Sequence, residues 1–292
     1  MNNLSQTEEK CSWIEKFQVE KQHPSKTNFF SFCDAVFIIT VKKKNWTEYQ
    51  LDMLNNIYTL GCQDKTYWCF TKGYKQCDFE NGHHNLSFNW KIICEFCIRK
   101  NFQNILMLED DLLITNKLWN NYFEKKKKIL EVINNNKNEC LVFHFGQLPL
   151  ISIPINQYIA RGLNFNTQCI LINQLTAKEY LKIYSQRIKK NKKMYHVDTF
   201  YLFKNKFKKY NLIPNNIFFQ KSNINSTSNQ KGLELLFYRF QYLYTGRIYY
   251  QYDSKFVSFW ELIRGFTILT ILLVILVVII LCATIWLCKM KK

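Results

Sequence analysis

The feature that most constrains this sequence is an apolar run that ends in three consecutive carboxylates, within residues 104–114. The run 105–108 predicts a strand buried on both faces, as in the parallel sheet of an α/β protein. Glu109, Asp110 and Asp111 follow directly, and open α/β sheets bind their ligands at the carboxyl ends of the strands. Adjacent carboxylates that lose water repel one another, so a divalent cation could compensate them. A solvated acidic turn is the alternative.

Strands and helices are expected to alternate around this stretch, because short continuous runs of apolar residues, typical of buried strands, alternate with apolar residues at helical spacing. The expected strands are 34–41, 65–71, 140–146 and 167–172, and the expected helices are 46–60, 86–100, 116–134 and 175–188. The first strand, helix and strand predict a right-handed βαβ unit. Residues 148–166 contain two prolines and predict an irregular loop, either a lid or an acceptor-binding segment.

The two ends of the chain differ from the part between them. Residues 1–30 predict a polar leader with a short helix near 13–19 and no signal peptide. Residues 232–264 are rich in aromatic and basic side chains, which suits a membrane interface. Residues 265–287 carry no charge and are long enough to cross a hydrocarbon layer of roughly 30 Å, and 288–292 form a basic tail.

The charge of the chain allows two interpretations. Lys and Arg number 40 against 22 Asp and Glu, a formal net charge of +18. The charge is either spread over a solvated surface or attracts anions such as nucleic acid, anionic lipid or nucleotide diphosphates. The scattered clusters of lysine favour the solvated surface.

Eleven cysteines do not predict a disulfide framework, and reduced thiols suit a cytosolic domain. Cys94 and Cys97 form a Cys-x-x-Cys motif, which is found in zinc sites. No second such motif accompanies it, and the two positions fall on one apolar helix face. Buried free cysteines are therefore the favoured interpretation, with zinc as the alternative.

The helix, short loop and strand that lead into Glu109-Asp110-Asp111 resemble glycosyltransferase family 25, which includes lipopolysaccharide glycosyltransferases and collagen galactosyltransferases. The resemblance implies an α/β fold: a GT-A-like nucleotide-sugar-binding sandwich with a mostly parallel central sheet, over residues 31–231. A single C-terminal transmembrane helix would follow it. In that family the acidic triplet corresponds to the Asp-x-Asp motif, which holds a metal ion and a nucleotide sugar.

The resemblance also implies roles for individual residues. Glu109 and Asp111 would hold Mn²⁺ or Mg²⁺, and Asp110, Lys42 and Gln220 would contact the donor, expected to be a UDP-sugar. The ion would bridge the diphosphate oxygens and stabilise the charge of the leaving group.

Asp198 is the candidate general base for the acceptor hydroxyl, with Glu109 as a second catalytic candidate. A helix N-cap is the alternative role for Asp198. The function implied is an inverting, membrane-anchored glycosyltransferase that acts on a protein, lipid or glycan hydroxyl, with no nucleic-acid partner. Its catalytic domain would lie in the cytosol, attached through a single-pass C-terminal anchor.

Two other functions stay open, because the chain departs from the family pattern. The first loop has Lys42 where the family often has arginine, and Thr167 opens a strand that the family often precedes with histidine or glycine. A catalytically degenerate, virion-type structural membrane protein is one alternative. A basic membrane protein that binds nucleic acid or anionic lipid is the other.

Overall fold

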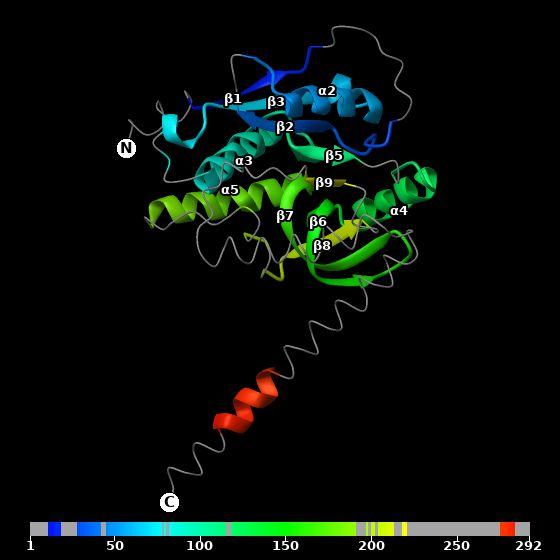
Figure 1. Ribbon diagram of the computed structural model, residues 1–292, viewed down its shortest axis with the longest axis vertical. Helices are drawn as coiled ribbons and strands as arrows, with labels where there is room; N and C mark the ends of the chain where they lie inside the picture. The colour runs from blue at the N-terminus through cyan, green and yellow to red at the C-terminus, as the bar shows by residue number, and fades with distance from the viewer. Residues whose placement is uncertain are drawn as a thin grey trace, which may run out of the picture.

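The computed structural model describes residues 11–18, 28–41, 45–77, 79, 82–114, 118–190, 197, 200–201, 204–212, 218–220 and 275–283 (Figure 1). The strands are β1 Ser12–Lys16, β2 Ala35–Val41, β3 Thr66–Thr71, β4 Asn104–Glu109, β5 Leu112–Ile114, β6 Cys140–Pro154, β7 Ile159–Asn173, β8 Phe207–Leu212 and β9 Phe218–Gln220. The α-helices are α2 Glu48–Leu60, α3 Gly82–Arg99, α4 Tyr122–Asn135 and α5 Gln174–Lys189. Two short 3-10 helices are η1 Gln63–Lys65 and η2 Tyr74–Cys77.

Seven strands form one mixed sheet in the order β1-β3-β2-β4-β7-β6-β8, and β5 pairs with β9 in a separate small sheet. β2 is parallel to both β3 and β4, and β6 is parallel to β8. β1 is antiparallel to β3, and β7 is antiparallel to β4, β6 and β8. Only β1 and β7 therefore run against the common direction of the large sheet.

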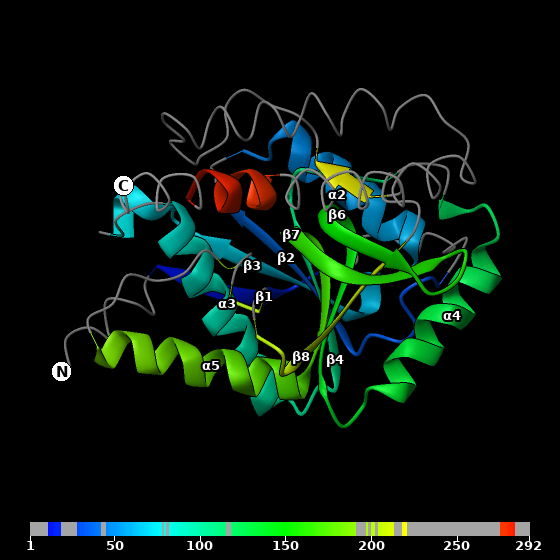
Figure 2. The same ribbon diagram turned by 90° about the horizontal axis from the view of Figure 1, so that it is seen from below.

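Two hydrophobic cores lie on opposite faces of this sheet, because successive side chains along a strand point to opposite faces. On one face, Val36 and Ile38 of β2 share a core with Met53 of α2 and Ile129 of α4. On the other face, Phe37 shares a core with residues of α3 and α5. Figure 2 shows α3 and α5 lying next to each other, away from α4. The molecule is thus a sheet covered by helices on both faces.

Helix α2 is the next element in the chain after β2, and its ends are defined by local chemistry. Thr47 is its N-cap, and Thr47 and Gln50 form a reciprocal capping box. Gly61 ends the helix in the left-handed conformation with φ 63° and donates its backbone N–H to carbonyls of the last turn. Gln50 also donates its side-chain amide to the carbonyl oxygen of Val41, which holds the first turn of α2 at the carboxyl end of β2.

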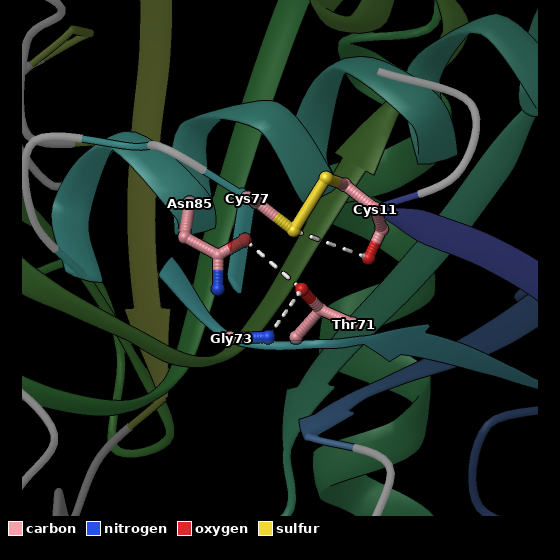
Figure 3. The surroundings of a disulfide bond; sticks show 5 residues. All are labelled: Cys11, Thr71, Gly73, Cys77 and Asn85. Carbon is pink, nitrogen blue, oxygen red and sulfur yellow. Dashed lines mark hydrogen bonds between the residues drawn. A yellow bond between two sulfur atoms is a disulfide. The ribbon is translucent and has the colours of Figure 1, made fainter. Parts of the chain in front are cut away.

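The amino-terminal part of the described chain differs from the predicted polar leader and short helix. Residues 12–16 form β1, which pairs with β3 and adds an edge to the sheet. This pairing brings Cys11 beside the turn after β3, where it forms a disulfide with Cys77 (Figure 3). The expectation of reduced cysteines is therefore wrong at this pair. The two residues are 66 positions apart, so only the strand pairing brings them together.

A long hairpin replaces the irregular loop predicted at 148–166. β6 and β7 pair from Val142 opposite Ile172 to Pro154 opposite Ala160. The prolines misled the prediction, since proline normally interrupts a strand. Register shifts between residues 144 and 151 interrupt regular pairing around Pro149, as β-bulges do.

The predicted transmembrane helix at 265–287 is contradicted. In the part of the chain that the structure describes, no helix combines the length and the apolar character needed to cross a bilayer. The single-pass membrane location derived from the segment is corrected with it. Residues 265–274 and 284–287 lie outside the described residues.

Candidate active site

The three carboxylates lie in the turn between the end of β4 and the start of β5. Glu109 is the last residue of β4 and pairs with Ile39 near the carboxyl end of β2. Asp110 and Asp111 form the turn itself, and all three residues are partly exposed. The predicted position of the triplet at the carboxyl end of a buried strand is therefore the observed one.

This turn coincides with a reversal in the strand order. From β2 the chain passes through α2 to β3 on one side of β2, whereas β4 lies on its other side. In open α/β sheets, ligands bind outside the carboxyl ends of the strands at such a topological switch point. The acidic turn therefore lies where this type of sheet binds ligands.

The pleat of β4 distributes the carboxylates between the two faces of the sheet. Leu106 and Leu108 belong to the core that α2 and α4 cover, whereas Ile105 and Met107 belong to the opposite core. The same alternation assigns Glu109 to the face of α3 and α5. Asp110 accepts a hydrogen bond from Thr40 on the α2 side, so Glu109 and Asp110 point to opposite faces.

A chain of hydrogen bonds connects Asp110 to the first turn of α2. The Thr40 hydroxyl donates to Asp110 Oδ2, and Gln50 Nε2 donates to Thr40 Oγ1 over 2.8 Å. Gln50 Nε2 also reaches the carbonyl oxygen of Val41 over 3.2 Å. Thr40 and Gln50 are each 3% exposed, so water does not compete freely for these bonds.

The strand after the acidic turn is held from two sides. Asn56 of α2 donates its side-chain amide to the carbonyl oxygen of Leu112 over 3.2 Å. β5 pairs antiparallel with β9, and this register sets Gln220 opposite Leu112. The structure thus brings the backbone of the predicted donor-binding residue Gln220 next to the acidic turn.

The other predicted site residues are not placed. Lys42 and Asp198 lie outside the described residues. Among the residues that the structure does describe, no three His, Cys, Asp or Glu side chains are grouped so that they could hold a metal ion.

Cys94 and Cys97 lie on α3, buried in the core beneath α5. Burial raises the pKa of the Cys97 thiol to about 12, and it raises the pKa of Cys94 well above its usual value. Metal coordination requires thiolates, so two neutral thiols in an apolar core match the interpretation as buried free cysteines.

Thr40 and Gln50 were missed as site residues when the sequence was read alone. Thr40 looked like one more residue of a buried strand, and its partner is 70 positions away. One signal was available for Gln50, because Thr47-x-x-Gln50 is the sequence pattern of a capping box. That pattern places Gln50 in the first turn of a helix, but it does not show that the Gln50 side chain also bonds Thr40.

The sequence matches no protein-family model and no curated protein. Among solved structures, the chain is similar to a glycosyltransferase involved in the glycosylation of the major capsid of PBCV-1. The identity is 14% and the TM-score 0.39, over 65% of this chain and 94% of the other. A similarity this low assigns no function, which has to be argued from the site.

Proposed function

We propose that the chain is a glycosyltransferase that moves a sugar from a nucleotide-sugar donor to a hydroxyl of a protein, lipid or glycan. The observation that carries this proposal is the bond from Thr40 to Asp110. It joins the carboxyl ends of β2 and β4 across the switch point and so fixes the acidic turn where a ligand of this sheet would bind.

The segment between β2 and α2 suits the diphosphate of such a donor. It leads into the amino end of a 13-residue helix, where backbone N–H groups and the helix dipole favour anions. Lys42, the first residue after β2 in the sequence, would add a positive charge to this segment. Gln220, on the strand beside the acidic turn, would contact the donor from the other side.

The carboxylates suit a divalent cation if the donor supplies ligands as well. Mg²⁺ is usually bound by one or two carboxylates together with substrate phosphates and water. Glu109 and Asp111 would be those carboxylates, with Mn²⁺ as the alternative ion. The ion would supply charge stabilisation at the diphosphate leaving group. This arrangement does not need a third protein ligand, and the described residues offer none grouped with these two.

An acceptor hydroxyl must lose a proton as it attacks the sugar carbon. We assign this role to Asp198, which would accept the proton, with Glu109 as the second candidate. Direct attack on the donor inverts the configuration at the anomeric carbon. An inverting reaction with Asp198 as base is therefore the mechanism we propose.

The test is the Mn²⁺-dependent hydrolysis and binding of a panel of nucleotide sugars by the purified full chain. We expect one donor to be bound and slowly hydrolysed, and Asp111→Asn to reduce hydrolysis by roughly 100-fold. Asp64→Asn is the matched control, because Asp64 is an exposed carboxylate in η1, before the amino end of β3. A wild-type chain that neither binds nor hydrolyses any donor would refute the proposal. Equal losses in the two variants would also count against it.

A further inference from the structure

The hydrogen bonds between α2 and the acidic turn have a fixed direction. The Gln50 side-chain oxygen Oε1 accepts the backbone N–H of Thr47 over 2.9 Å. Because that partner can only donate, the amide nitrogen of Gln50 must face the other way, toward the Val41 carbonyl and Thr40. The capping box of α2 therefore settles the orientation of the Gln50 amide.

The direction continues from Gln50 to the carboxylate. Gln50 Nε2 can only donate, so Thr40 Oγ1 accepts from it. The hydroxyl of Thr40 has one proton, and that proton is directed to Asp110 Oδ2. Every donor from α2 to the acidic turn thus points the same way, and the carboxylate of Asp110 is the final acceptor.

We propose that Thr40 and Gln50 are positioning residues for the candidate active site. Thr40 holds the Asp110 side chain toward β2, and Gln50 holds the hydroxyl of Thr40 in the donating orientation. With Asp110 held in this way, the turn 109–111 keeps one conformation, in which Glu109 and Asp111 are presented for the donor and its cation. This inference rests on the proposed glycosyltransferase function.

A comparison with Thr66 separates the role of Thr40 at the site from a general contribution of a buried threonine to folding. Thr40 and Thr66 are both buried threonines of the same sheet, in the parallel strands β2 and β3. Thr66 donates its hydroxyl to the carbonyl oxygen of Cys62 over 2.7 Å, at the amino end of β3. Thr66→Val therefore removes a buried hydroxyl and its hydrogen bond, as Thr40→Val does, but at the edge opposite the acidic turn.

The first measurement is binding of UDP, GDP and CMP to the full chain in the presence of MnCl₂, by calorimetry. For the nucleotide that the wild type binds, we expect Thr40→Val to weaken binding roughly tenfold, the effect of losing one hydrogen bond to a charged group. Thr40→Ser keeps the hydroxyl and is expected to restore binding to within about twofold, whereas Gln50→Glu cannot donate to Thr40 and is expected to resemble Thr40→Val. Thr66→Val is expected to bind like the wild type.

The second measurement is thermal unfolding of Thr40→Val, Asp110→Asn and the double variant. Residues in direct contact give non-additive effects, so the double variant should lose less than the sum of the single losses in Tm. Additive losses would overturn the inference, as would unchanged nucleotide binding by Thr40→Val beside normal wild-type binding. A wild-type chain that binds none of the nucleotides would overturn the proposed function and this inference together.

Discussion

Removal of the Cys11–Cys77 disulfide should destabilise the domain by an amount set mainly by the length of the chain that it closes. The two cysteines are 66 positions apart, and the bridge joins the start of β1 to η2, just after β3. In the chain-entropy description, a loop of that length contributes about 4 kcal/mol at 25 °C. For a domain of this size, such a loss lowers Tm by roughly 10 °C.

The assay is thermal unfolding of the full chain, followed by circular dichroism with and without a reductant. We expect Cys77→Ala and Cys11→Ala each to lower Tm, and the double variant to resemble the single variants, because all three lose one bridge. Reductant should lower the Tm of the wild type and leave the variants unchanged. Cys282→Ala is the control, since Cys282 is a free and exposed cysteine.

One result would refute the reasoning. If reductant left the wild-type Tm unchanged, and Cys77→Ala unfolded at the same temperature as Cys282→Ala, the bridge would contribute no closure entropy. The pairing of β1 with β3, together with the 3.0 Å hydrogen bond from the backbone N–H of Lys72 to the carbonyl of Cys11, would then be enough to keep β1 on the sheet.

Two further predictions concern stability. Gly61→Ala should lower the free energy of unfolding by about 1 kcal/mol, because Gly61 ends α2 with φ 63°, where a side chain is disfavoured. Urea unfolding measures this loss, and an unchanged unfolding midpoint would contradict the prediction. Burial lowers the pKa of Lys125 to about 8, below its usual 10.5, so between these values the unfolded chain holds a proton that the folded chain lacks. The free energy of unfolding should therefore rise from pH 8 to 10.5 more steeply in the wild type than in Lys125→Met, and parallel pH profiles would be the contrary result.

The sequence was informative where local pattern decides the structure. The predicted strand 34–41 is β2, and the strand before the acidic triplet is β4, because uninterrupted apolar residues of strand length indicate a buried strand. The helix predicted over 46–60 is α2, with Gly61 as its end. Each of these elements is specified by residues within its own length.

Pairing between distant segments was not readable from pattern. β1 covers only five positions and shows no regular alternation of polar and apolar residues, and it becomes a strand through its pairing with β3. β6 continues through Pro149 because β7 pairs with it on both sides of that residue, from Val142 to Pro154. At the site, Thr40 was read as part of a buried strand, since its role depends on Asp110, which is remote in sequence.

The pairing of β5 with β9 has a consequence for the order in which the protein acquires its site. Leu112, just after the acidic turn, pairs with Gln220, which comes much later in the chain. During synthesis the large sheet up to β8 precedes β9, so the neighbourhood of the carboxylates is completed only when β9, the last of the described strands, has been made. A chain released from the ribosome before that point would carry the acidic residues without the strand that borders them.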